Sequence, residues 1–211
     1  MTVKIKTCGI TNEEDAVRAV NLGAHYLGLN FSTDSARKVS PDVAEQIARK
    51  VPPFVTTVGV FVEQGPEEIV KIVRKVGLMG VQLHGDHTPE DVRAVAEKAE
   101  VTLIRAVRVA EEKDLETIAA FQGIVSHVLL DAKVEGLAGG TGTLVPWVLA
   151  AQSKSFGVPL FLEGGLTPQN VRQAASEVQP FAVDVASGVE ISPRRKDIEK
   201  MKTFINEARA A

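Results

Sequence analysis

The chain has 211 residues, of which 45% are hydrophobic and 24% are charged, the balance of an ordinary globular protein with one large or two small domains. Its 24 Lys and Arg residues nearly balance its 27 Asp and Glu residues, so the net charge of −3 gives no reason to expect a nucleic-acid or membrane partner. The single cysteine excludes an internal disulfide, and no apolar run approaches the ~18 residues of a membrane-spanning helix, so we expect a cytoplasmic protein.

Eight short runs of apolar and β-branched residues predict eight β-strands. In chain order they are Val3–Thr7, Tyr26–Phe31, Phe54–Val62, Gly80–Leu83, Val101–Val107, His127–Leu130, Pro159–Leu162 and Phe181–Val185. The stretches between them have helical spacing, as in Ile69, Val70, Val73 and Val76, which fall on one face of a helix with 3.6 residues per turn. The chain is therefore predicted to alternate strand, loop and amphipathic helix.

Capping residues and glycines predict where the helices begin and end. Thr11 and Glu14 form a candidate capping box. Four more start signals put a capping oxygen before a proline suited to the first helical position; they are Ser40-Pro41, Thr88-Pro89, Thr167-Pro168 and Ser192-Pro193. Left-handed C-caps are expected at Gly23, Gly77, Gly123 and Gly157.

This alternation predicts an α/β fold with a parallel sheet that helices cover on its outer face. Eight strands favour closure into a (β/α)8 TIM barrel, and at this length the barrel fills residues 1–211 as a single domain. An open doubly wound sheet is the competing fold. It more often carries a G-x-G-x-x-G fingerprint after its first strand, which "CGITNE" does not match.

Polar residues stand at the ends of most predicted strands. They are Cys8, Asn30 with the loop to Arg37, Glu63, His84, Arg108, Asp131, Glu163 and Asp184. Taken singly, such a residue is more often a cap or a solvated loop residue than a functional one. In a TIM barrel, however, all eight strand ends meet at one face, and that face carries the active site.

Small residues follow the last two strands directly. "LEGGL" supplies Gly164 and Gly165, and "VASGV" supplies Ser187 and Gly188. In this architecture such loops let backbone N–H groups approach an anion, and the alternative is that they are simply two tight turns. We therefore predict a small phosphorylated substrate. A third glycine-rich stretch, residues 138–143, is interpreted as a mobile loop near the site.

Cys8 and Asp131 come from the first and sixth strands, which lie roughly opposite each other in an eight-stranded ring. An acid and a base that face each other across a pocket can catalyse an isomerisation by proton transfer. At pH 7 an ordinary thiol is only about 3% ionised, so this role predicts a lowered pKa for Cys8 and a carboxyl group at Asp131 that burial keeps protonated. The alternative for Cys8 is a small buried hydrophobe.

The order and spacing of several segments resemble one family over essentially the whole chain. The segments are "KTCGIT", "YLGLNF", "SARKV", "VGVFVE", "VQLHGD", "LLDAK", "GGTGT", "LEGGLTPQNV" and "VDVASGVE". They are similar to the phosphoribosylanthranilate isomerases of tryptophan biosynthesis. This resemblance implies a cofactor-free Amadori rearrangement of N-(5'-phosphoribosyl)anthranilate, with no metal, in a monomer or a homodimer.

The resemblance also implies a role for each matching residue. Asp131 matches the general acid that protonates the furanose ring oxygen, and Cys8 matches the general base that removes the C2' proton. Arg37 matches the arginine that binds the anthranilate carboxylate. Gly164, Gly165, Ser187 and Gly188 match the phosphate loops, and His84 and Asp184 match positioning residues near the site.

Four positions depart from the family pattern. Ala186 replaces a more common serine, Glu163 stands where alanine is usual, Ala36 replaces proline, and Thr7 replaces an apolar residue. A carboxylate at Glu163 would repel a phosphate dianion unless it pointed away or were paired. No departure removes a predicted catalytic group.

Two other functions fit parts of the pattern. An isomerase of histidine biosynthesis, or a bifunctional relative, would share the fold and phosphate site. Those enzymes generally use two aspartates, so Cys8 argues against them. A catalytically silent phosphate-binding or thiol-sensing protein would keep the pocket without the reaction, and loss of activity in Cys8→Ala and Asp131→Ala with unchanged phosphate affinity would reject it.

Overall fold

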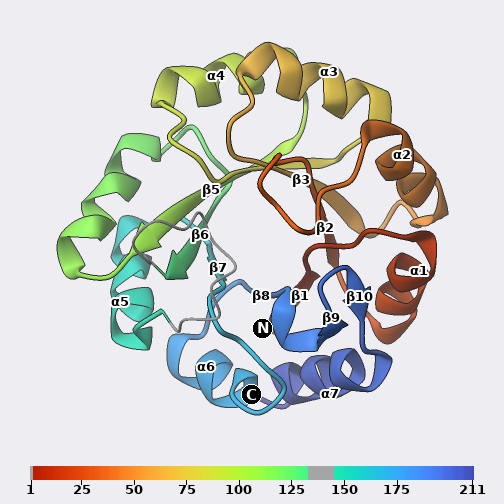
Figure 1. Ribbon diagram of the computed structural model, residues 1–211. Helices are drawn as coiled ribbons and strands as arrows, with labels where there is room; N and C mark the ends of the chain where they lie inside the picture. Colours follow the sequence, from red (N-terminus) through yellow and green to blue (C-terminus); the bar gives the residue numbers. More distant parts are fainter. Residues whose placement is uncertain (1, 133–144) are drawn as a thin grey trace.

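The computed structural model describes residues 2–132 and 145–211. It contains a closed barrel of eight parallel strands in sequential order, in which β8 pairs with β1 (Figure 1). The strands are β1 (Lys4–Thr7), β2 (Tyr26–Asn30), β3 (Thr56–Phe61), β4 (Gly80–Leu83), β5 (Thr102–Val109), β6 (His127–Ala132), β7 (Leu160–Leu162) and β8 (Ala182–Val185). The predicted (β/α)8 TIM barrel is confirmed, and each predicted strand overlaps an observed one.

Helices surround the barrel as an outer ring (Figure 1). The α-helices are α1 (Glu13–Leu22), α2 (Pro41–Lys50), α3 (Pro66–Val76), α4 (Pro89–Lys98), α5 (Trp147–Gln152), α6 (Val171–Val178) and α7 (Ile198–Arg209). Three segments are 3-10 helices: η1 (Glu112–Phe121), η2 (Ser153–Phe156) and η3 (Ser187–Val189). A small antiparallel hairpin, β9 (Glu190–Ser192) with β10 (Arg195–Lys196), follows η3. Within the described ranges, no helix is long and apolar enough to cross a membrane.

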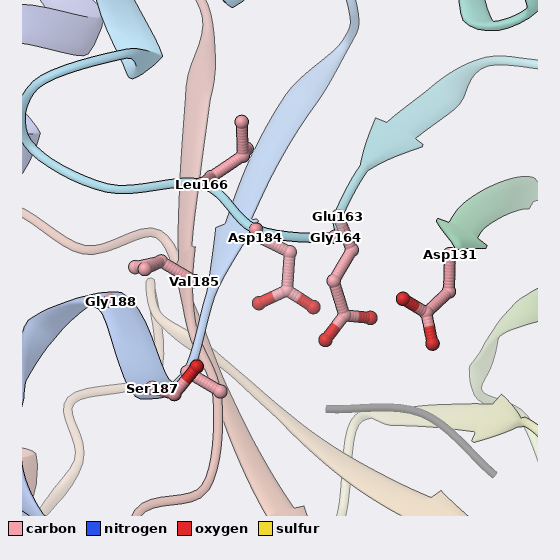
Figure 2. Close-up of a pocket in the computed structure, with 10 residues that line it drawn as sticks. Asp131, Glu163, Gly164, Leu166, Asp184, Val185, Ser187 and Gly188 are labelled. Atoms are coloured by element: carbon pink, nitrogen blue, oxygen red, sulfur yellow. The ribbon is translucent and has the colours of Figure 1, made fainter. Parts of the chain in front are cut away.

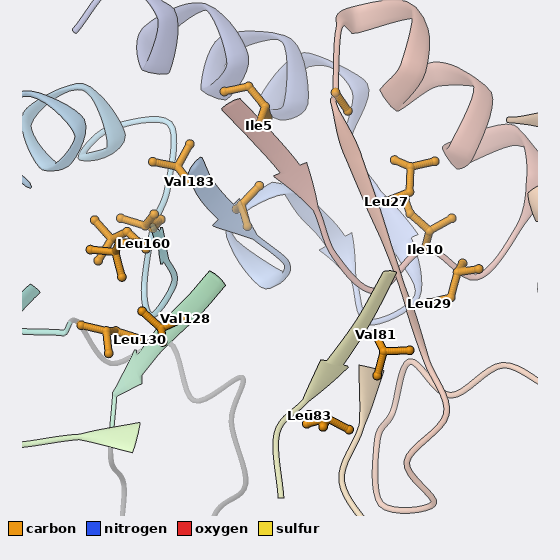
Figure 3. Packing of buried hydrophobic residues seen from close by; sticks show 14 of the residues in the cluster. Ile5, Ile10, Leu27, Leu29, Val81, Leu83, Val128, Leu130, Leu160 and Val183 are labelled. Carbon is orange, nitrogen blue, oxygen red and sulfur yellow. The ribbon is translucent and has the colours of Figure 1, made fainter. Parts of the chain in front are cut away.

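The apolar core has two parts because strand side chains alternate between the two faces of the sheet. The larger part packs between barrel and helices and includes Ile5, Leu27, Val81 and Val183 (Figure 3). The smaller part is a separate cluster inside the barrel. Its members are Val58, Ile104, Ala106, Leu129, Phe161 and Ala182, with Tyr26 packed against them.

Two of the predicted helix starts are confirmed and one is wrong. Ser40 and Thr88 accept hydrogen bonds from the first turns of α2 and α4, and each precedes a proline at the first helical position. The predicted capping box at Thr11 is wrong: Asn12 is the N-cap of α1 and accepts from the Asp15 N–H. The Thr11 hydroxyl instead donates to the Arg194 carbonyl, a contact from a distant part of the chain.

The last two predicted starts differ in outcome. The Thr167 hydroxyl oxygen accepts from the Gln169 N–H, and its carbonyl accepts from Asn170 and Val171 N–H, so Thr167 does supply a capping oxygen, but a turn follows it and α6 begins only at Val171. Ser192 ends the hairpin strand β9 rather than capping a helix, and α7 begins only after Asp197, whose side chain caps it. Prediction was better for the helix exits: Gly23, Gly77, Gly123 and Gly157 all adopt positive φ.

Candidate active site

A pocket opens where β6, β7 and β8 end (Figure 2). Its lining comes from the ends of these strands and from the loops after β7 and β8. The lining residues are Asp131, Glu163, Gly164, Gly165, Leu166, Asp184, Val185, Ala186, Ser187 and Gly188. One pocket thus joins the predicted general acid to both predicted phosphate loops.

The two loops fit together only because their residues are small. Gly164 and Gly165 have φ values of 90° and 61°, a left-handed backbone that glycine adopts without strain. A β-carbon added at Gly188 would lie 2.1 Å from the Leu166 carbonyl oxygen, so the loop after β8 packs directly on the loop after β7. The backbone of both loops therefore borders the pocket without intervening bulky side chains, as an anion cradle requires.

Three carboxyl groups extend into this pocket side by side, from Asp131, Glu163 and Asp184 (Figure 2). Asp131 and Asp184 are each only 1% exposed. Each of the three has one buried oxygen with no hydrogen-bond partner among the described residues: Asp131 Oδ2, Glu163 Oε2 and Asp184 Oδ1. Because an unpaired buried polar atom is costly, these oxygens are poised to bind a ligand.

Lys6 was not predicted as a site residue, yet it is fully buried beneath the pocket. It is the register neighbour of Asp184 across the β1–β8 pair, and its ammonium group forms an ion pair with that carboxylate. Burial alone would lower the pKa of Lys6, but Asp184 and the neighbouring acids raise it above its usual value. The sequence held a signal, because Lys6 and Cys8 share the strand face opposite the core residue Ile5.

Cys8 lies at the end of β1 and is 7% exposed. Its N–H donates to the Val185 carbonyl at 2.8 Å, which ties it to the end of β8. Gly28 on the neighbouring strand leaves the space that the thiol occupies, since a β-carbon there would lie 2.6 Å from Cys8 Sγ. Gly9, with φ of 73°, leaves a similar space that Arg37 fills, so Arg37 lies beside the cysteine.

The predicted lowering of the Cys8 pKa is wrong for the ligand-free protein. Burial raises the pKa of the thiol to about 11, helped by Asp184 and Glu163 and opposed by Lys6 and Lys196. Burial and the approach of Glu163 and Asp184 from distant parts of the chain are tertiary effects, which the sequence around Cys8 does not show. A pKa four units above neutrality means that thiolate formation at pH 7 costs about 5 kcal/mol.

Arg37 is held by a carboxylate of the chain itself. Its Nε donates to Glu190 Oε1 at 2.8 Å and its Nη2 to Glu190 Oε2 at 2.6 Å. The buried Lys196 ammonium also donates to Glu190 Oε1, at 3.0 Å, and to the Ala186 carbonyl. Glu190 and Lys196 were not predicted, because only the hairpin after β8 brings them to the loop that carries Arg37.

His84 and Asp131 lie close together, as expected for two site residues. His84 Nε2 is 3.3 Å from Asp131 Oδ2, although neither atom makes a hydrogen bond with good geometry among the described residues. On the other side of the ring, Gln82 Nε2 lies 3.3 Å from His84 Nδ1. The imidazole is therefore held between an amide and the predicted acid.

The other polar strand ends have structural contacts. Glu63 accepts a hydrogen bond from the Thr33 N–H. Burial is the largest single influence on the pKa of this carboxyl and raises it, but several hydrogen bonds from Ser32, Thr33 and its own backbone together lower the pKa to about 2. Arg108 forms an ion pair with the exposed Asp86. Residues 138–143, predicted as a loop near the site, lie outside the described residues. In the described ranges, no group of three or more His, Cys, Asp or Glu residues could hold a metal ion.

The chain is similar throughout its length to one family. A family model described as N-(5'-phosphoribosyl)anthranilate (PRA) isomerase matches residues 5–207. An N-(5'-phosphoribosyl)anthranilate isomerase of Trichlorobacter lovleyi is 43% identical over 209 residues, with 99% of each chain covered. The crystal structure of the phosphoribosylanthranilate isomerase of Thermotoga maritima is 42% identical, with a TM-score of 0.91 over 99% of this chain and 100% of that one.

Two further solved structures carry information on ligand and assembly. Each is 40% identical with a TM-score of 0.88, over 99% of this chain and 100% of its own. One is a phosphoribosylanthranilate isomerase in complex with reduced 1-(o-carboxyphenylamino)-1-deoxyribulose 5-phosphate. The other describes monomers generated from the dimeric enzyme of Thermotoga maritima. The bound ligand thus has a carboxylate at one end and a phosphate at the other.

Proposed function

The chain belongs to the N-(5'-phosphoribosyl)anthranilate isomerase family and is an isomerase of tryptophan biosynthesis, and from this premise we propose its mechanism and its catalytic residues. It converts N-(5'-phosphoribosyl)anthranilate to 1-(2-carboxyphenylamino)-1-deoxyribulose 5-phosphate by a cofactor-free Amadori rearrangement. Asp131 is the general acid and Cys8 the general base. The observation that carries this proposal is the single pocket shared by Asp131 and the glycine loops after β7 and β8.

In the first step the Asp131 carboxyl group gives its proton to the ring oxygen of the ribose. The bond between that oxygen and C1' breaks, and the anthranilate nitrogen shares its electron pair with C1', which leaves an open-chain iminium cation and an Asp131 carboxylate. The buried Oδ2 of Asp131 has no hydrogen-bond partner among the described residues, so it is available to the ring oxygen. His84, 3.3 Å away, helps to hold the carboxyl group in place.

In the second step the Cys8 thiolate takes the proton from C2', and the electron pair neutralises the iminium as an enolamine. The positive charge formed in the first step stabilises a thiolate beside it, and Lys6 and Lys196 act in the same direction. This order of events offsets the high pKa of the buried thiol in the ligand-free protein. Tautomerisation to the ketone moves a proton from the C2' hydroxyl to C1'. The two steps leave a Cys8 thiol and an Asp131 carboxylate, and transfer of one proton from that thiol to Asp131 before each turnover gives the thiolate and the carboxylic acid that the next two steps use.

The substrate is oriented by its two anionic ends. The phosphate binds to the backbone of Gly164, Gly165, Ser187 and Gly188, and the carboxylate binds to Arg37. Glu190 engages Nε and Nη2 of Arg37, so Nη1 is the guanidinium nitrogen left to donate to the substrate carboxylate. A relative whose bound ligand has both anions supports this arrangement, and the dimeric relative supports a homodimer as one of the two expected assemblies.

The decisive experiment mixes the protein with freshly generated N-(5'-phosphoribosyl)anthranilate and follows loss of the anthranilate-linked fluorescence. We expect rapid loss with the wild type, and at least a hundredfold slower loss in Cys8→Ala and Asp131→Asn, with affinity for the reduced product analogue retained. No acceleration by the wild type would reject the proposed reaction. Full activity of both variants would reject the residue roles while leaving the reaction in place.

A further inference from the structure

Among the described residues, Glu163 is a carboxyl group of the pocket that forms no ion pair. It directly follows β7 and immediately precedes Gly164 and Gly165. Glu163 is therefore the chain neighbour of the loop that we propose to bind the phosphate. Its side chain lies between those of Asp184 and Asp131 (Figure 2). Its Oε2 is buried and has no hydrogen-bond partner among the described residues, whereas Asp184 is paired with Lys6.

Charged and titratable groups approach Glu163 from every adjoining element that the structure describes. They are Asp184 on β8, Asp131 on β6, Lys6 on β1, Cys8 after β1 and Arg37 in the loop after β2. The two cations are already engaged, Lys6 by Asp184 and Arg37 by Glu190. Burial and the carboxyl groups of Asp184 and Asp131 therefore raise the pKa of Glu163 well above its usual range.

A phosphate dianion in the adjacent cradle would strengthen this effect, because a second negative charge beside Glu163 further opposes its ionisation. An ionised Glu163 would repel the ligand, whereas a neutral carboxylic acid can donate a hydrogen bond to it. Glu163 therefore disfavours an anionic ligand when its carboxyl group is ionised and favours it when that group is protonated.

We propose that Glu163 is a specificity-determining residue that binds the phosphosugar as an undissociated acid, donates a hydrogen bond to it, and so makes binding proton-linked. This inference rests on the proposed phosphosugar site and adds to it a requirement that the catalytic pair does not impose. When the free protein has lost the Glu163 proton, ligand binding takes up one proton. Affinity then falls up to tenfold for each pH unit above the pKa of Glu163 in the free protein, because one proton enters with each ligand.

The test is calorimetric titration of the wild-type protein with reduced 1-(o-carboxyphenylamino)-1-deoxyribulose 5-phosphate between about pH 7.5 and about pH 9.5. A phosphate monoester is already a dianion there, since its second pKa is about 6. Buffers of different ionisation enthalpy report proton uptake directly. Glu163→Gln replaces the acid with a neutral amide that still donates a hydrogen bond, and Glu177→Gln, at an exposed position of α6, is the matched control.

We expect affinity of the wild type and of Glu177→Gln to fall with pH while protons are taken up. Glu163→Gln should show at least tenfold less pH dependence and no linked uptake from this position. Equal pH profiles in wild type and Glu163→Gln, or no proton uptake by the wild type at any pH, would overturn the inference and leave the proposed function intact. Failure of the analogue to bind the wild type at any pH would instead overturn the proposed function, and this inference with it.

If Glu163→Gln did not fold, a second measurement on the wild type would decide. Infrared difference spectra between ligand-bound and free protein would then show whether a protonated carboxyl band persists or gains intensity when the analogue binds above neutral pH. Disappearance of that band on binding would contradict the proposal.

Discussion

At the scale of single residues, glycines decide where the thiol of Cys8 can lie. Gly28 on β2 faces Cys8 across the strand pair, and Gly9 leaves space for Arg37 beside it. Neither glycine carries chemistry of its own. They matter because a side chain at either position would move a group that the proposed reaction needs.

Gly28→Ala should therefore reduce activity sharply. The added methyl group would lie 2.6 Å from Cys8 Sγ and 3.0 Å from its Cα, so the thiol or the strand must shift. We expect a kcat loss of at least tenfold and a loss of about 1–3 kcal/mol in the free energy of unfolding. Turnover by the fluorescence assay and unfolding in urea measure the two effects.

Gly65→Ala is the matched control, because no atom lies within 4 Å of the position of its added methyl group. Its φ of −78° suits any residue, so activity should be unchanged. Gly65 is the N-cap of α3, where alanine is less favourable than glycine, so stability should fall by no more than about 1 kcal/mol. Similar losses in the two glycine variants would show that the space beside Cys8 is not what matters.

The raised pKa of Cys8 gives a second prediction at this scale. Alkylation by iodoacetamide requires the thiolate, and Cys8 is the one cysteine in the chain, so labelling reports this site alone. In the native protein the labelling rate should climb tenfold per pH unit and level off only near pH 11, whereas the urea-unfolded chain should level off near about 8.5. Mass spectrometry measures the extent of labelling. If native and urea-unfolded protein gave the same dependence of labelling rate on pH, burial would not raise the pKa of Cys8. The reduced product analogue should slow labelling of the native protein.

The residues of the site differ in how far the sequence could predict them. Cys8, Asp131 and the glycine loops stand at strand ends, which can be located from the apolar runs in the sequence. Lys6 was within reach through strand alternation. Glu190 was not, because its contact with Arg37 joins segments 153 positions apart through a hairpin that had no sequence signature.

At the scale of elements, strands were easier to predict than helix starts. A buried parallel strand is apolar on both faces, so its sequence signal is local and survives folding. Which of several adjacent polar residues caps a helix depends on the other hydrogen bonds that the tertiary structure gives them. Before α1 the Thr11 hydroxyl donates to the Arg194 carbonyl, and Asn12 is the N-cap.

Asn12→Ala should therefore destabilise the protein although Thr11 has the stronger sequence pattern. Asn12 Oδ1 accepts from the Asp15 N–H at 2.8 Å, and loss of such a cap costs about 1 kcal/mol. Asn21→Ala, at an exposed position near the end of the same helix, should leave stability equal or up to about 0.7 kcal/mol higher, because alanine is the better helix former. Urea unfolding compares the two, and equal effects would argue against the cap.

At the scale of the whole molecule, the barrel interior is divided along its axis. The strand beginnings carry aromatic rings, with His127 packed 5.2 Å from Phe161 and 4.6 Å from Phe181 between ring centroids. The strand ends carry Lys6, Asp184 and the other polar groups of the pocket. An apolar floor thus separates the reacting groups from solvent at the opposite end of the barrel, which keeps the electrostatic interactions above it strong.

His127, packed among these aromatic rings, should make the free energy of unfolding sensitive to acid. Burial lowers the pKa of its imidazole below 6.5, and Nδ1 has no hydrogen-bond partner among the described residues. Between the lowered pKa and 6.5 the unfolded chain binds more protons at this ring than the native chain, so the free energy of unfolding falls as pH drops through that window.

His127→Phe keeps an aromatic ring and removes the titration, so its unfolding free energy should fall less between about pH 7.5 and about pH 5. The difference between variant and wild type isolates this ring from His25, whose pKa burial also lowers, and from Glu163 and Asp184, whose raised pKa values act with the opposite sign. Parallel pH profiles in urea unfolding would place the acid sensitivity elsewhere in the barrel.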